Sequence, residues 1–232
     1  MSKPVAVVVG VGPGIGAAVG KAMAARGYAV ALLSRSGGFT DTLSTTIPGS
    51  RAYRCDVTDH ASIEAAFRSI ATDLGPVDAL LYNAGSGKFT GIDDTSLEDL
   101  EHAWRINTWG LMACAKECLP HMKARGGAIV VTGATASLRG GLRTTAFAQA
   151  KAAQRSLAQS MAKQLGPLGV HVALVIVDGV VDLPRTRAMM PDKPAEFFLA
   201  PDDIAKSVVH VVEQPRSAWT FELDLRPHIE KW

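Results

Sequence analysis

The chain has 232 residues, of which 47% are hydrophobic and 20% charged, which argues against a disordered chain and suits one α/β domain with a substantial core. The 24 basic and 22 acidic residues give a formal net charge of +2, so the charge gives no reason to expect nucleic acid or an anionic membrane as partner. Without a signal-peptide pattern or an apolar segment long enough to span a bilayer, we expect a cytoplasmic protein with a single domain over residues 1–232.

The cysteines and histidines do not predict a metal site. Cys55, Cys114 and Cys118 lack the paired spacing of a zinc site or of a disulfide framework, and we expect buried thiols. His171 alternates with apolar neighbours in a predicted strand, which is typical of a structural histidine.

The N-terminal stretch predicts a buried strand that runs directly into a glycine-rich turn and a helix. Residues 5–9 are all apolar, the glycines include Gly10, Gly14 and Gly16, and residues 17–26 have a helical pattern. Glycines allow a tight turn and close approach to a ligand, and the free N–H groups that open a helix favour a pyrophosphate. The pattern favours a dinucleotide site, with a tight turn that binds no ligand as the alternative.

The end of the second predicted strand, residues 28–33, bears on the choice of cofactor. An acidic residue at this position would bind the ribose 2′-hydroxyl of NAD, whereas an arginine accommodates the 2′-phosphate of NADP. Here the strand ends in Ser34 and Arg35. This favours NADP(H) over NAD(H), and the alternative is that Arg35 is an ordinary surface residue.

Two further predicted strands, residues 51–55 and 77–82, end in residues suited to ligand binding. Asp56 follows the first, where its carboxylate would either accept a hydrogen bond from an adenine amino group or serve as a plain turn residue. Asn83, Ala84 and Gly85 follow the second and form a small-residue turn that allows close backbone approach.

A long helix is predicted up to Pro120 or slightly beyond. Thr95 and Glu98 have the spacing of a capping box, and apolar residues recur at helical spacing from Leu100. Asn107 interrupts the middle of this helix, where either a buried polar or catalytic role or simple exposure would explain it.

The second half of the chain continues the alternation of strands and helices. Residues 128–132 and 170–177 predict strands, and the helix between them carries Phe147 and Lys151. Residues 183–200 are rich in proline, methionine and phenylalanine and predict either an apolar lid over a substrate pocket or a packed connection. Residues 219–225 alternate like a seventh strand.

With these features placed, nearly the whole chain resembles the short-chain dehydrogenase/reductase family. The resemblance implies a single-domain Rossmann fold, a doubly wound parallel sheet of about seven strands, and a bound dinucleotide. Ser34 and Arg35 are similar to its NADP(H)-preferring branch. The family's cofactor motifs are matched by Gly10, Gly14, Ile15 and Gly16 in the first turn, by Asp56 and Val57, and by Asn83, Ala84 and Gly85.

The resemblance is incomplete at the catalytic residues. Asn107 and Lys151 match two positions of the family's Asn, Ser, Tyr and Lys set, while Phe147 stands at the tyrosine position and Ala134 at the serine position. Of the family's P-G-x-x-x-T loop, only Gly179 remains.

Asp178 and Leu183 replace the proline and threonine of that loop. Lys151 is expected to hydrogen-bond the nicotinamide ribose, and it is a candidate proton source if its pKa is lowered by burial. Thr135 and Ser137 are further candidate hydroxyls.

Besides ordinary carbonyl reduction with another side chain supplying the proton, the missing tyrosine and serine leave two hypotheses. The leading one is an atypical NADPH-dependent oxidoreductase that reduces an imine or an activated carbonyl. Positioned acid catalysis commonly accelerates a reaction by about 10²–10⁴-fold, and the residues that usually provide it are missing, so the reduction of an ordinary ketone should be slow. The alternative is a catalytically inactive NADP(H)-binding sensor or interaction protein. The resemblance also implies a small-molecule substrate and a homodimer or homotetramer paired through the helices that carry Trp104 and Phe147.

Overall fold

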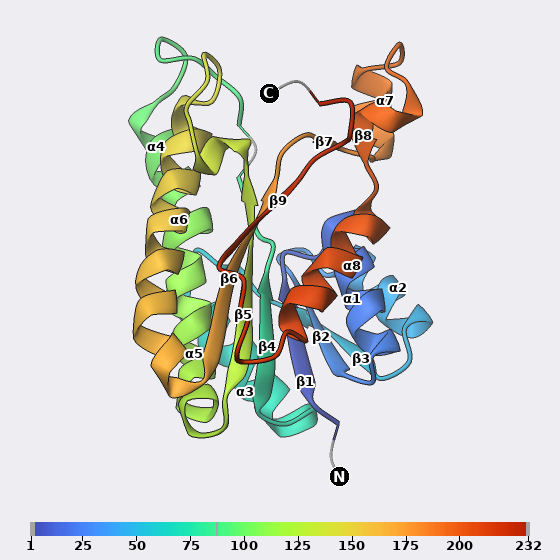
Figure 1. Ribbon diagram of the computed structural model, residues 1–232, viewed down its shortest axis with the longest axis vertical. Coiled ribbons are helices and arrows are strands. Elements are labelled where there is room, and N and C mark those ends of the chain that lie inside the picture. The colour runs from blue at the N-terminus through green and yellow to red at the C-terminus, as the bar shows by residue number, and fades with distance from the viewer. Residues whose placement is uncertain (1–2, 87, 231–232) are drawn as a thin grey trace.

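Seven parallel strands form the central sheet of the computed structural model, which describes residues 3–86 and 88–230 (Figure 1). In space their order is β3-β2-β1-β4-β5-β6-β9. The strands are β1 (Val5–Val9), β2 (Ala29–Ser34), β3 (Ser50–Arg54), β4 (Val77–Tyr82), β5 (Gly127–Ala134), β6 (Val170–Val177) and β9 (Glu222–Leu225). The predicted fold class is confirmed. Because β1 lies between β2 and β4, the direction in which strands are added reverses beside β1, and ligands bind at such a switch point in open α/β sheets.

Helices cover both faces of the sheet, which explains why the strands are apolar along their whole length (Figure 1). One face carries α1 (Ile15–Ala25), α2 (Gly38–Thr46) and α8 (Pro201–Val212). The other carries α3 (His60–Asp73), α5 (Gly110–Arg125) and α6 (Thr145–Leu165), with α4 (Leu97–Trp104) packed against α6. Every residue of β1 and of β6 is buried between these layers. Among the described residues, no helix has the length and apolar character needed to cross a membrane.

Residues 183–200 pack as a small ordered unit beside the carboxyl ends of the strands. They contain α7 (Pro184–Met189) and β8 (Phe198–Leu199), and β8 pairs with β7 (Val180–Val181). Arg187 of α7 contacts both β8 and the residue before the segment. Its guanidinium group lies 4.1 Å from the Phe198 ring centre and 2.7 Å from the Asp182 carboxylate. These are the contacts of a packed connection, and movement of the segment as a lid stays a prediction.

Some details differ from the sequence-based prediction, among them the division of the predicted long helix into α4, a π-helical turn and α5. The pattern did not indicate α2, a short helix with only Thr40 and Leu43 buried. The last strand begins at Glu222 rather than at residue 219, because Trp219 stacks on His171 and the Thr220 N–H donates to Gln214.

The capping box lies one residue later than predicted. Ser96 caps α4 together with Asp99, while the Thr95 hydroxyl donates to the Gly91 carbonyl. The three cysteines are buried free thiols, as predicted. The prediction of a hydrogen-bonded structural histidine holds in part: His171 is buried with its Nε2 2.8 Å from the Thr220 carbonyl oxygen, while its Nδ1 has no hydrogen-bond partner among the described residues.

Candidate functional site

The candidate site is a cleft of three adjoining cavities at the carboxyl ends of the central strands. A cavity of about 400 Å³ lies beside the end of β2, one of about 1050 Å³ lies along the glycine turn, and one of about 670 Å³ lies over β5 and α6. Asn83 lines all three, so the cavities form one continuous surface.

The glycine turn has the backbone geometry that the sequence predicts. Gly10 has φ +83°, and a Cβ there would lie 2.5 Å from backbone atoms of Ala84. Asn83 reinforces this approach by donating from Nδ2 to the Gly10 carbonyl over 2.9 Å. The first turn of α1 has no side-chain cap and no acidic residue. Its N–H groups therefore suit an anion, and the turn fits the pyrophosphate of a dinucleotide.

The cavity beside β2 suits the adenosine end of such a cofactor. Ser34 and the exposed Arg35 line it, and the Ser34 hydroxyl lies 2.8 Å from that of the buried Thr40. Asp56 also lines it, but one of its carboxylate oxygens already accepts from the Thr58 N–H at 2.9 Å and hydroxyl at 2.7 Å. These bonds lower the pKa of Asp56. Asp56 thus serves as a turn residue while its carboxylate also borders the cavity.

Asn107 lies in a π-helical turn, Arg105–Trp109, between α4 and α5. The wider turn frees carbonyl groups from the helical ladder, and side chains from other elements bind them. The Tyr82 hydroxyl donates to Ile106 over 2.5 Å, and the Gln154 amide donates to Asn107 over 2.7 Å. Asn107 itself is fully buried, so the exposed alternative is wrong.

Lys151 is buried in the same region and is held by two acceptors. Its Nζ donates to the Thr132 carbonyl over 2.8 Å and to the Gln154 Oε1 over 3.0 Å. An ammonium group has three donors, so a third remains for a group bound in the cavity. Burial lowers the pKa of Lys151 to about 7, because a charged amine is costly to remove from water.

Gly85 separates Lys151 from Asn107 at the floor of the cleft. A Cβ at Gly85 would lie 3.3 Å from Asn107 Oδ1 and 3.7 Å from Lys151 Nζ, so both polar atoms face this turn. Within the described chain Asn107 Oδ1 has no hydrogen-bond partner, although Asn107 Nδ2 donates to Ala103 over 2.8 Å. A buried acceptor without a partner marks a place for an additional donor.

Phe147 stands at the position where a tyrosine is expected, and its ring lies beside that of Phe89. The Phe147 and Phe89 ring centres are 5.3 Å apart, and Lys151 Nζ lies 5.9 Å from the Phe147 ring centre. Of the two candidate hydroxyls, Thr135 lines the cavity and donates to the Asp178 carboxylate. Ser137 is buried in a turn, where its oxygen accepts from the Ala134 N–H over 3.1 Å.

The cleft brings together the residues that the sequence proposes for cofactor binding. Each of the following lines at least one cavity: Gly10, Gly14, Ile15, Gly16, Ser34, Arg35, Asp56, Val57, Asn83, Ala84, Gly85, Lys151 and Gly179. Asn107 lies behind Gly85 rather than on the surface of the cleft. The sequence reasoning missed Gln154, which joins Asn107 to Lys151 and whose only sequence signal is its position three residues after Lys151.

A separate cluster on α3 and α5 brings His60, Glu64 and Glu117 within 4.8 Å of one another. It was not predicted from the sequence. His60 and Glu64 form an i,i+4 pair 3.7 Å apart, and His60 makes an edge contact with the Trp109 ring.

The comparisons with known proteins agree with this architecture. A family model described as short chain dehydrogenase matches residues 4–193. The 3-oxoacyl-[acyl-carrier-protein] reductase of Mus musculus is 28% identical over 208 residues, which cover 87% of this chain and 88% of the reductase.

Two solved structures are also similar over almost their whole length. A short-chain dehydrogenase from Rhodopseudomonas palustris has a TM-score of 0.82 and 32% identity, covering 97% of this chain and 99% of its own. An alcohol dehydrogenase from Thermococcus sibiricus, complexed with 5-hydroxy-NADP, has a TM-score of 0.88 and 26% identity, covering 99% of both chains. The chain therefore belongs to the short-chain dehydrogenase/reductase family, whose members are oxidoreductases.

Proposed function

We propose that the protein is an NADPH-dependent reductase of an activated carbonyl compound or an imine, and that Lys151 provides the proton which a tyrosine normally provides. The observation that carries this proposal is the buried Lys151 Nζ, which lines the cavity with a pKa lowered to about 7. A general acid works best when its pKa is near the working pH. Phe147 has no hydroxyl group and therefore cannot donate this proton.

The proposed reaction needs one hydride and one proton. A nicotinamide cofactor held along the glycine turn would supply the hydride for the carbonyl carbon and would itself be oxidised from NADPH to NADP⁺. The Lys151 ammonium group gives its proton to the carbonyl oxygen, so that the product is an alcohol, and the amine regains a proton from solvent. A protonated imine needs no proton on an oxygen, because its positive charge already draws the hydride to carbon and the product is an amine.

Gln154 and Asn107 hold Lys151 in place for this step. Gln154 accepts from the ammonium group and donates to the Asn107 carbonyl, so a single buried amide fixes Nζ relative to the π-helical turn. Because Gln154 has no exposed surface, water does not compete for either bond.

The choice of NADP(H) over NAD(H) rests on the end of β2. Ser34 and Arg35 line the adenosine-side cavity, and no acidic residue stands at the end of the strand to repel a 2′-phosphate. The Thermococcus sibiricus relative, which was solved with an NADP derivative, supports the same choice.

The alternative is an NADP(H)-binding sensor without turnover. One observation supports it: Phe147 and Ala134 stand where the family has tyrosine and serine, so both usual hydroxyls are absent at these positions. The test measures NADPH and NADH affinity by titration, and then NADPH oxidation with a panel of imines and activated carbonyls. Tight NADPH binding with substrate-dependent oxidation is the expected result. Tight binding without oxidation by any compound favours the sensor, and absence of binding by either cofactor contradicts both functions.

We further propose a cytoplasmic homodimer or homotetramer that pairs through the helices carrying Trp104 and Phe147. Leu97 and Trp104 on α4 are 81% and 40% exposed. Exposure of large apolar side chains to water is unfavourable in a monomer, and a partner subunit would bury them. Light scattering at working concentration tests this, and a monomeric mass contradicts it.

A further inference from the structure

Arginine side chains from two different segments border the candidate substrate cavity. Arg139 comes from the loop between β5 and α6, and Arg185 comes from α7; both line the cavity that contains Lys151. Arg143, from the same loop as Arg139, lines the adjoining cavity together with Arg185. In Figure 1 this loop and α7 stand on opposite sides of the carboxyl ends of the strands.

These three positive charges are not balanced by the protein. In the described part of the chain, neither cavity is lined by an aspartate or a glutamate, and none of the three arginines forms an ion pair within 4.0 Å. Carboxylates are present nearby but already have arginine partners, since Asp182 pairs with Arg187 at 2.7 Å and Asp178 with Arg226 at 3.6 Å.

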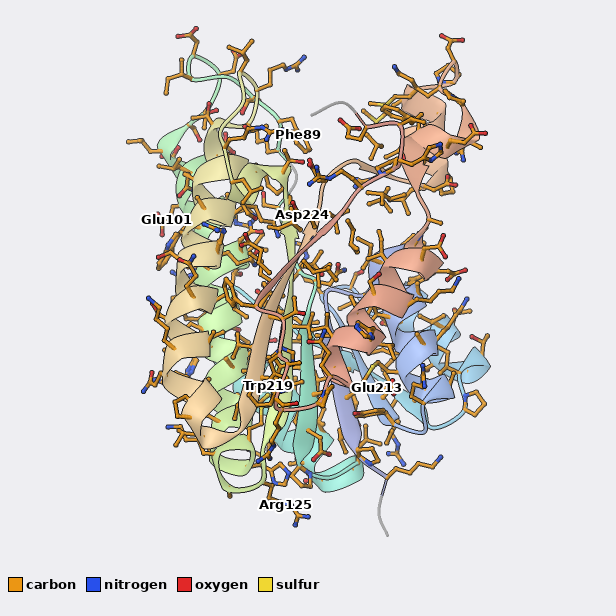
Figure 2. The ribbon with its side chains drawn as sticks, viewed as in Figure 1. Phe89, Glu101, Arg125, Glu213, Trp219 and Asp224 are labelled. Atoms are coloured by element: carbon orange, nitrogen blue, oxygen red, sulfur yellow. The ribbon has the colours of Figure 1, made fainter. Side chains whose placement is uncertain are left out.

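The body of the cavity is apolar in contrast to this border. Phe89 and Phe147 form its aromatic wall, and Val180 and Val181 of β7 also line it. Figure 2 shows Phe89 among the loops above the carboxyl ends of the strands, and its side chain is 53% exposed. The cavity therefore suits a compound with an apolar body and a charged end.

We infer that the substrate carries an anionic group, a carboxylate or a phosphate ester, which Arg139 and Arg143 bind while the apolar body contacts Phe89 and Phe147. Arginine presents its donors in a planar fork that matches both anions. Arg143 and Arg185 both line the glycine-turn cavity, where a cofactor pyrophosphate fits, whereas Arg139 lines only the cavity that contains Lys151. The inference therefore rests first on Arg139, and Arg143 of the same loop adds its charge from the adjoining cavity.

The inference builds on the proposed reductase function and narrows its substrate class. Unbalanced positive charge lowers the free energy of a bound anion and raises that of a bound cation. It therefore favours an anionic carbonyl compound over a protonated imine.

The test compares anionic and neutral aromatic aldehydes of similar size. The carboxylate pair is 4-formylbenzoate with methyl 4-formylbenzoate, and the phosphate pair is 4-formylphenyl phosphate with 4-methoxybenzaldehyde. Calorimetry measures the affinity of each for the protein saturated with NADP⁺, and NADPH oxidation is measured separately. The larger of the two anion preferences identifies which anion the site recognises.

We expect at least one anion to bind about tenfold or more tightly than its neutral partner, with the preference shrinking as ionic strength rises. The double variant Arg139→Gln/Arg143→Gln should abolish this preference, because the affinity for the anions should fall by more than the affinity for the neutral aldehydes. The control Arg125→Gln, at the far end of the molecule in Figure 2, should retain the preference.

The inference is overturned if both anions bind no more tightly than their neutral partners, or if none of the compounds binds. It is also overturned if the anion preference persists in the double variant. Binding and turnover separate its failure from that of the reductase function. Reduction of neutral aldehydes without any anion preference overturns only the inference. Anion binding that depends on the two arginines, without reduction of any aldehyde, supports it and contradicts the reductase function.

Discussion

The Gln154 amide oxygen lies 3.0 Å from the Lys151 ammonium nitrogen, and both residues are buried on the same face of α6. The other end of the same amide binds the Asn107 carbonyl. The position of the proposed proton donor is thus set by a residue three positions away, which contacts the ammonium group from within the protein core.

Changing Gln154 should move the pH dependence of the reaction. Gln154→Glu places a carboxylate beside the ammonium group, which raises the pKa of Lys151 and moves the loss of activity to higher pH. Gln154→Leu removes the acceptor, which lowers that pKa and moves the loss to lower pH. It also lowers the free energy of unfolding by about 1–3 kcal/mol, because buried partners lose their hydrogen bonds. A purely structural role would change stability in denaturant titrations without moving the pH profile of kcat/KM.

Restoring the family's hydroxyls should increase the reduction of ordinary ketones. In the double variant Phe147→Tyr/Ala134→Ser, the new hydroxyls would lie in the cavity beside Lys151, since both positions line it. A positioned acid and an oxyanion donor are each worth about 10²-fold or more, so kcat for a neutral ketone should rise by at least about that factor. Each single variant serves as the matched control. No gain in any variant would mean that the cavity no longer holds a ketone in a reactive position.

The cofactor preference should depend on Arg35. Arg35→Asp replaces a positive charge with a carboxylate that repels a 2′-phosphate and accepts from a ribose hydroxyl. Hydrogen bonds to charged groups contribute about 1.5–3 kcal/mol, so NADPH affinity should fall by about 10-fold to 100-fold while NADH affinity is retained or improves. Parallel titrations measure the ratio of the two affinities. An unchanged ratio would show that Arg35 is a surface residue without a role in cofactor choice.

The glycine turn offers a matched pair of variants. Gly10→Ala combines an unfavourable φ of +83° with a Cβ 2.5 Å from the Ala84 backbone, whereas a Cβ at Gly12 meets nothing within 4 Å. Gly10→Ala should lower the free energy of unfolding by more than about 1 kcal/mol, and Gly12→Ala should change it by less than about 0.5 kcal/mol. Equal stabilities in denaturant titrations would contradict the close approach of the two turns.

The sequence predicts the strands well because helices cover both faces of the sheet, which leaves long apolar runs such as residues 5–9 and 170–177. The capping box was misplaced by one residue because Thr95, equally suited to capping, binds the preceding loop instead. Asn107 and Lys151 were found through a family pattern.

Gln154 and the border arginines were not found, since their roles depend on contacts between distant segments. Gln154 meets Asn107 across 47 positions of the chain. Arg139 and Arg185 come to one cavity only because the β5–α6 loop and α7 lie at the same end of the sheet. Scattered basic residues in a sequence give no signal of such an arrangement.

The role of Lys151 as proton donor is tested most directly by the pH dependence of single-turnover NADPH oxidation. The assay uses saturating NADPH and an activated carbonyl, and compares the wild type with Lys151→Met and Lys151→Arg. Only the protonated amine donates, so the wild-type rate should be constant below the Lys151 pKa of about 7 and should fall about tenfold per pH unit above it. Arginine keeps the positive charge but does not release its proton in proteins, so both variants should be slower by about 10²-fold or more and lack this fall. A wild-type rate that stays constant from about pH 6 to about pH 9, or an unchanged profile in Lys151→Met, would contradict the role of Lys151 as the proton donor.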